Sequence, residues 1–241
     1  MNCREKILSE DYHDFIVSDI RMPFLQDMLE KDCCLQNPGF FYQCAYLSKS
    51  VIKPVSLENY SYFSIPKCYS LLSMQALNQA GILPIQNHST IQLSGKQVMI
   101  GFLDTGIDYQ NPVFQHLDKT TRIAGIWDQT IQSGTPPESF DYGSHYTPDM
   151  INEALASEDP YSLVPSVDNN GHGTFLASIA AGSGDPDAQF IGAAPESVIA
   201  VVKLKQAKQY LRDYYFIPNT APAFQENDIM LGMRYLHLLA E

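Results

Sequence analysis

The sequence has few basic residues and no long apolar run. It carries 15 lysines and arginines against 27 aspartates and glutamates, so its net charge is −12 and its isoelectric point about 4.8. Nucleic acids and anionic membrane surfaces are themselves negative, so we expect neither as a main partner. No apolar run approaches the roughly 20 residues that a membrane-spanning helix needs. We therefore expect no membrane partner.

Cysteine is also scarce and confined to one end. The five cysteines all lie within the first 68 residues: Cys3, Cys33, Cys34, Cys44 and Cys68. An odd count with an adjacent pair does not suggest a disulfide framework, and no C-x-x-C spacing suggests structural zinc. The N-terminus also lacks the basic start and apolar core of a secretory signal. We therefore expect reduced thiols and an intracellular protein.

Residues 1–65 differ from the rest of the chain. Strands are expected at 12–18 and 40–47, with a turn at 37–39 and a helix that begins at Pro23. This small α+β unit carries no recognisable chemistry. With hydrophobic residues at 45% of 241, the whole chain can form one large domain or two modest ones.

Residues 66–241 show the pattern of an α/β fold. Short apolar runs predict buried strands at 98–104, 122–128 and 197–204. Helices are expected at 71–80, 147–155, 173–181 and from 227 onward, whereas 206–226 reads as irregular and 113–167 as a long insertion. The pattern predicts a doubly wound parallel sheet with helices on both faces.

Two residues carry the chemistry of this sheet. The strand that ends at Asp104 places a carboxylate at the sheet edge where α/β proteins bind their ligands. His172 opens an apolar helix further along the chain. Histidine is the usual base that activates a hydroxyl, and a buried aspartate usually orients it. Alone, each residue could be a turn or cap residue, but together and in this order they indicate two thirds of a Ser-His-Asp site.

The surrounding motifs resemble those of subtilisin-like serine proteases, peptidase family S8, over about residues 66–241. The motifs are Leu77–Gly81, Asp104–Asp108, Asn170–Thr174 and Gly192–Pro195. Further motifs are similar to the clostridial germination proteases of the Csp type: Ile126–Thr130, Lys203–Lys205 and Tyr210–Asp213.

This resemblance implies that Asp104 orients His172 and that His172 is the general base of a serine endopeptidase. The family's nucleophile lies in Gly-Thr-Ser-x-Ala, and no Gly-Thr-Ser occurs here. The oxyanion-hole asparagine and the substrate-binding strand would also follow Glu241. We therefore expect an N-terminal fragment that is inactive alone. Its partners would be a protein or peptide substrate, the C-terminal part of the catalytic domain, and its own propeptide-like residues 1–65.

The sequence departs from the family pattern in three places. Val113 stands at the usual position of a calcium ligand, so we expect no cofactor, and Phe175 stands at a second histidine. His172 follows Asp104 by 68 positions, a longer spacing than is usual in the family. The insertion at 113–167 explains the difference. The resemblance and the thiols together predict a cytoplasmic or spore-associated protein.

The remaining polar candidates are weak. The other histidines lack the spacing of metal ligands: His13, His88, His116, His145 and His237. Four acidic residues suggest a solvated surface: Asp141, Asp149, Glu153 and Asp159. The loop 182–187 could bind a cation but has no EF-hand pattern. The alternative function is a pseudoprotease or assembly partner, although a scaffold has no chemical need for Asp104 and His172.

Overall fold

The computed structural model describes residues 1–18, 32–39, 41–69, 94–184 and 191–241. The chain forms two compact units. Unit 1 comprises Met1–Ser70, Pro136–Tyr142 and Lys205–Tyr235, and unit 2 comprises Leu71–Thr135, Gly143–Leu204 and Leu236–Glu241. The helices expected from Pro23 and at 71–80 lie outside the described residues, as does His88.

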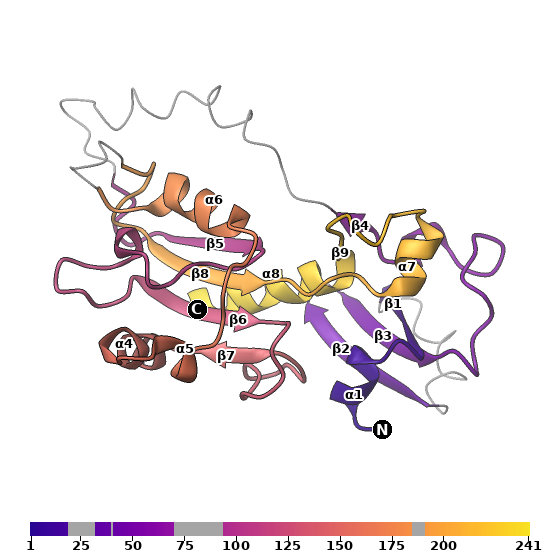
Figure 1. The fold of residues 1–241 in the computed structure, drawn as a ribbon. Helices are drawn as coiled ribbons and strands as arrows, with labels where there is room; N and C mark the ends of the chain where they lie inside the picture. Colours follow the sequence, from indigo (N-terminus) through magenta and orange to yellow (C-terminus); the bar gives the residue numbers. More distant parts are fainter. Residues whose placement is uncertain (19–31, 40, 70–93, 185–190) are drawn as a thin grey trace. The chain divides into compact units, whose positions relative to one another are not determined.

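Unit 1 contains a three-stranded antiparallel sheet. Its strands β1 (Tyr12–Ser18), β3 (Tyr42–Ser48) and β2 (Cys33–Gly39) lie in the order β1-β3-β2 (Figure 1). Alternate side chains of β1 and β3 form a hydrophobic core on one face of this sheet, and its buried members are Phe15, Val17, Ala45 and Leu47.

Two expectations for residues 1–65 have clear outcomes. The strands at 12–18 and 40–47 are confirmed by β1 and β3, while a short helix α1 (Cys3–Leu8) was not expected. The expected turn at 37–39 instead forms the end of β2, where the register with β3 shifts between Gln36 and Gly39. The residues at 37–39 are typical of turns, so the strand β2 was not expected. A β-bulge accommodates these residues within the strand.

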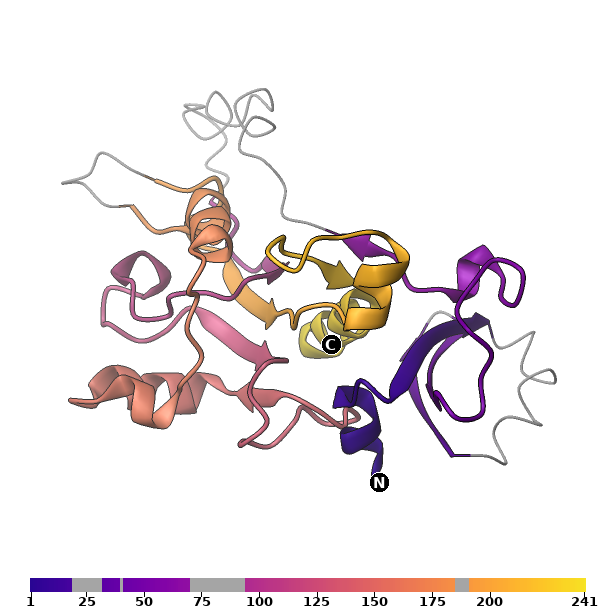
Figure 2. The ribbon, with the colours of Figure 1, turned by 45° about the vertical axis from the view of Figure 1, so that its right-hand side comes forward.

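A large part of unit 1 comes from the segment Lys205–Tyr235, which follows the strands of unit 2 in the sequence. The strands β4 (Cys68–Tyr69) and β9 (Phe224–Gln225) pair antiparallel (Figures 1 and 2). The helix α7 (Gln209–Tyr214) precedes β9, so the expectation of irregular structure throughout 206–226 was wrong. The buried guanidinium of Arg212 explains this, since it donates to the carbonyls of Ala207 and Ala221 and ties the segment together.

Unit 2 contains the predicted parallel sheet. The strands β5 (Met99–Asp104), β8 (Val198–Lys203) and β6 (Ile123–Asp128) run parallel in that order, and β7 (Ser144–Tyr146) joins β6 antiparallel. The stretch expected as an insertion thus supplies β6, which lies inside the sheet. The α/β fold class and the positions of the three strands are confirmed, but the expected burial of 98–104 was wrong, because β5 lies at the end of the strand order and only its Asp104 is buried.

Helices pack on both faces of this sheet. The helices α6 (His172–Ala181) and α4 (Pro148–Ala156) cover one face, where Ala177, Ile151 and Ile199 share a core. On the other face, a Cβ at Gly101 would lie 2.5 Å from Leu236 Cδ1, so the end of α8 (Glu226–Ala240) packs directly on β5. A short helix α5 (Pro160–Leu163) follows α4.

The cysteines do not all remain free. A disulfide joins Cys3 of α1 to Cys34 of β2, while Cys44 and Cys68 are free thiols. The expectation of five reduced thiols was therefore wrong. Only the packing of α1 on β2 brings the two Cα atoms to 5.4 Å, a separation that a disulfide can span.

No helix among the described residues is long and apolar enough to cross a membrane.

Candidate active site

Three charged residues end the three parallel strands of unit 2. Asp104 ends β5, Lys203 ends β8 and Asp128 ends β6, and Lys203 is in register with both aspartates. Because the strands are parallel, these side chains lie at one edge of the sheet, the edge at which α/β folds bind ligands.

Asp104 and His172 meet at this edge. Asp104 Oδ1 lies 2.8 Å from His172 Nδ1, and their side chains are only 9% and 15% exposed. The same carboxylate oxygen accepts the backbone N–H of Thr105 at 2.7 Å. The carboxylate is thus held in place, and it can fix both the orientation and the tautomer of the imidazole.

Glycines allow the start of α6 to approach the end of β5. A Cβ at Gly173 would lie 2.2 Å from the carbonyl oxygen of Gly106, so no larger residue fits at this position. Gly171 caps the helix with φ +81°, a conformation that glycine adopts without strain. Gly173 therefore permits the close approach that brings His172 to the strand end, and Gly171 supplies the left-handed backbone conformation at the start of the helix.

Asp168 organises the histidine loop. Its Oδ2 accepts the N–H and the hydroxyl of Thr174 at 2.9 and 2.7 Å, and its Oδ1 accepts the hydroxyl of Thr105 at 2.7 Å. That Thr105 hydroxyl oxygen accepts the N–H of Gly173 at 3.0 Å. The network therefore ties both sides of the Asp104–His172 pair to one carboxylate.

The charge of Asp168 is stabilised by these contacts. Burial raises the pKa of this carboxyl, but the hydrogen bonds from Thr174, Thr105 and Gly171 outweigh burial and hold the pKa below its ordinary value. The sequence pattern alone suggested no role for Asp168. The sequence did offer a signal: Asp168 lies four residues before His172, and Thr174 lies two residues after His172.

A second buried carboxylate supports the same edge. Asp128 is fully buried; its Oδ2 accepts the hydroxyl of Ser166 at 2.7 Å and lies 3.4 Å from Lys203 Nζ. Lys203 Nζ also donates to the carbonyl of Val167 at 2.8 Å. Asp128 and Lys203 thus anchor the segment that leads to Asp168. The contact between Asp128 and Lys203 was not expected from the sequence.

Val113 does not fit a calcium site. Its side chain packs on the core of unit 2 and offers no oxygen. Its carbonyl already accepts the N–H and the hydroxyl of Ser183 at 2.8 and 3.0 Å, and Nη1 of Arg122 at 3.2 Å. Calcium requires six to eight oxygen ligands, so this position lacks what the ion needs.

The other candidate residues are scattered over both units. His13, His116, His145 and His237 belong to no group of potential metal ligands among the described residues. Asp149, Glu153 and Asp159 are exposed, and so are Asp141 and Phe175. Residues 185–187 of the loop 182–187 lie outside the described residues.

Comparisons with known proteins agree with this geometry. Residues 95–227, more than half of the chain, match the sequence model of the Subtilase family, Peptidase_S8. Two plant relatives from Arabidopsis thaliana are subtilisin-like protease SBT2.2, 32% identical over 131 residues, and SBT2.1, 30% identical over 132 residues. Each alignment covers 46% of this chain and 15% of the relative.

A solved structure is also similar. The CspB protease of Clostridium perfringens superimposes with a TM-score of 0.51 and is 34% identical, over 65% of this chain and 28% of CspB. The chain thus spans only a small part of the proteins that it matches. The sequence motifs, the sheet and these similarities agree, and this chain belongs to the subtilase family, peptidase family S8.

Proposed function

We propose that Asp104 and His172 are the aspartate and histidine of a Ser-His-Asp site that hydrolyses peptide bonds. The observation that supports this most directly is the 2.8 Å contact between Asp104 Oδ1 and His172 Nδ1. If Nδ1–H donates to the carboxylate, the lone pair of the ring is on Nε2. His172 then accepts the proton of an attacking serine hydroxyl and later gives it to the leaving amine.

We propose that the serine lies in a part of the protein that follows Glu241. In this proposal its hydroxyl attacks the peptide carbonyl and forms an acyl-enzyme, which water then hydrolyses. Asp104 stabilises the imidazolium that forms on His172. The 241-residue chain has no Gly-Thr-Ser, and a triad without its nucleophile loses essentially all its catalysis. We propose that this chain alone hydrolyses no peptide bond.

Residues 1–65 would act as a propeptide-like unit that stays attached. The support comes from Asp14 of β1, whose carboxylate is buried within unit 1. It accepts Lys208 Nζ at 2.5 Å, Gln225 Nε2 at 2.6 Å and Asn227 Nδ2 at 3.0 Å. Removal of β1 would leave the buried Lys208 without its carboxylate, which is strongly unfavourable.

The environment of the protein also remains a proposal. We propose a cytoplasmic or spore-associated protein with a peptide substrate and no cofactor in catalysis. The disulfide between Cys3 and Cys34 removes reduced thiols as an argument for that location, so the proposed location rests on the likeness to CspB.

The test uses the longer chain encoded beyond Glu241, assayed with a fluorogenic protein substrate. We expect Asp104→Asn to lower kcat about 10⁴-fold and His172→Ala about 10⁶-fold, the magnitudes known from serine-protease triads. His237→Ala is the matched control, because this histidine lies on an exposed part of α8 and should leave kcat unchanged. Full proteolysis by His172→Ala would overturn the assignment. A longer chain that binds peptide tightly without cutting it would favour the pseudoprotease alternative.

A further inference from the structure

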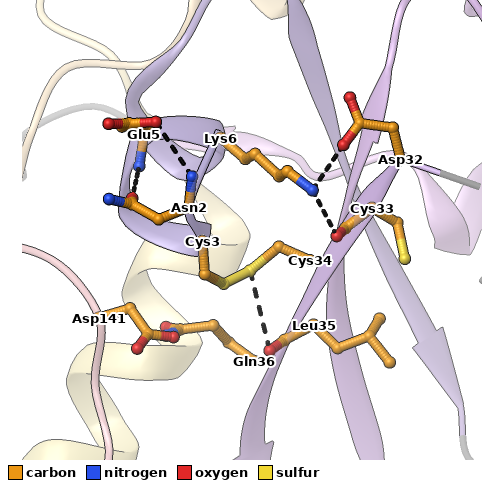
Figure 3. The surroundings of a disulfide bond; sticks show 10 residues. All are labelled: Asn2, Cys3, Glu5, Lys6, Asp32, Cys33, Cys34, Leu35, Gln36 and Asp141. Atoms are coloured by element: carbon orange, nitrogen blue, oxygen red, sulfur yellow. Dashed lines mark hydrogen bonds and ion pairs between the residues drawn. A yellow bond between two sulfur atoms is a disulfide. The ribbon is translucent and has the colours of Figure 1, made fainter.

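Three potential metal ligands converge in unit 1, whereas the residues assigned to catalysis belong to unit 2. They are Cys3 of α1, Cys34 of β2 and Asp141 of the segment Pro136–Tyr142 (Figure 3). One ligand atom from each, two sulfurs and a carboxylate oxygen, lie within 4.8 Å of one another. Cys34 is buried, Cys3 is partly exposed and Asp141 is exposed, so an ion could enter from the side of Asp141.

A neighbouring amide suggests that this cluster is incomplete without a ligand. Gln36 is only 5% exposed, and its Nε2 donates to Asp141 Oδ2 at 2.5 Å. Its Oε1, on the same amide carbon, is buried and has no hydrogen-bond partner among the described residues. An unpartnered buried oxygen is costly, and a cation or a cation-bound water would satisfy it.

The chemistry of the ligands selects the ion. Two thiolates and one carboxylate suit zinc and similar borderline cations in tetrahedral coordination. Calcium and magnesium require more oxygen ligands than are present here. We propose that the reduced protein binds one zinc-class divalent cation through Cys3, Cys34 and Asp141, with water or Gln36 Oε1 in the fourth position.

The same two sulfurs make the site dependent on redox state. In the structure they form a disulfide. A dithiol reductant would transfer two electrons and two protons to it, giving two thiols while the reductant itself becomes a disulfide. Binding of the cation then releases the two thiol protons to solvent. The oxidised chain therefore binds no cation here.

Metal binding would change which parts of unit 1 are joined. The disulfide connects only α1 to β2. The metal would add Asp141, which lies within residues 95–227 that match the family. In the oxidised site only the hydrogen bond from Gln36 links the N-terminal segment to Asp141, and the reduced, metal-bound site adds metal–ligand bonds to that link.

The experiment uses the full 241-residue chain, reduced and then freed of reductant under anaerobic conditions. Co²⁺ reports thiolate ligation by its sulfur-to-metal charge-transfer absorption, and Zn²⁺ affinity is measured by competition with a chromophoric chelator. We expect one ion per chain with two thiolate ligands, and none in the oxidised protein. Asp141→Asn should weaken Zn²⁺ at least about 10-fold, and Gln36→Ala about 10- to 100-fold.

Two cysteine variants provide the contrast. Cys34→Ser should abolish tight binding. Cys33→Ser is the matched control, because the neighbouring side chain points to the opposite face of β2 (Figure 3) and should bind as the wild type does. Asp141→Asn keeps both cysteines, so an unchanged melting temperature of its oxidised form verifies its fold.

The proposal is overturned if reduced wild type binds Zn²⁺ no more tightly than Cys34→Ser, or if Asp141→Asn binds as tightly as wild type. Loss of the thiolate absorption in Cys33→Ser would also overturn it, since that would place the ion on a different sulfur.

Discussion

Replacing His13 by phenylalanine should remove part of the acid sensitivity of this protein. His13 stacks on Tyr210 with ring centroids 3.9 Å apart, and neither ring nitrogen has a hydrogen-bond partner among the described residues. The pKa of His13 is lowered to about 4, mainly by burial and also by the charges of Lys49 and Lys208, while the charge of Asp14 opposes them. Between pH 6.5 and about 4, His13 therefore binds a proton in the unfolded chain but not in the folded chain.

The sign and size of the effect follow from this difference. A histidine whose folded pKa is depressed stabilises the fold fully above pH 6.5, and this stability is lost as the pH falls toward 4. The pKa difference corresponds to about 3.4 kcal/mol at most, at about 1.36 kcal/mol per pH unit. Because His13 keeps some contact with solvent, we expect about 1.5–3 kcal/mol.

Urea denaturation of wild type and of His13→Phe between pH 4 and 7.5 measures this contribution. Phenylalanine keeps the stacked ring but cannot bind a proton. We expect the free energies of unfolding of the two proteins to diverge steadily below pH 6.5, with wild type losing more. The exposed-site variant His237→Asn should follow wild type. Parallel pH profiles of wild type and His13→Phe would refute the reasoning.

Two further predictions concern buried contacts. Asp14→Ala should destabilise the chain by about 3–5 kcal/mol in urea denaturation, because it leaves Lys208 buried and uncompensated. Adding Lys208→Met should recover most of that loss, and a double variant as unstable as the single one would contradict the argument. Gly173→Ala should displace α6, because its Cβ would meet the Gly106 carbonyl at 2.2 Å. The displacement is measured as altered histidine NMR shifts, and an unchanged histidine spectrum would show that the close approach is not required.

The strongest local patterns predicted the fold well. The apolar runs that became β5, β6 and β8 form the three strands of a parallel sheet, for which composition alone is a strong signal. Most residues of β6 and β8 are buried, whereas β5 at the end of the strand order is mostly only partly buried. The helix α4 begins as expected, with the Thr147 hydroxyl accepting the N–H of Met150 and Pro148 in the first turn. These features depend on neighbours in the sequence, so the sequence alone could reveal them.

The features that were missed depend on distant residues. Asp14 and Lys208 are 194 residues apart, and Cys3 and Cys34 are brought together only by the packing of α1 on β2. In the site, Asp104 and His172 were identified because both have chemistry that a triad needs. Asp168 only accepts hydrogen bonds that set the loop geometry, and such a role cannot be recognised until the loop is seen.

The orientation of His172 by Asp104 is tested most directly by ¹⁵N NMR of the histidine rings in this 241-residue chain. At neutral pH we predict that the His172 proton is on Nδ1, with the downfield N–H signal of a hydrogen bond to a carboxylate. In Asp104→Asn that signal should disappear. A His172 that carries its proton on Nε2 in the wild type, or a ring unaffected by Asp104→Asn, would contradict the proposed acid–base pair.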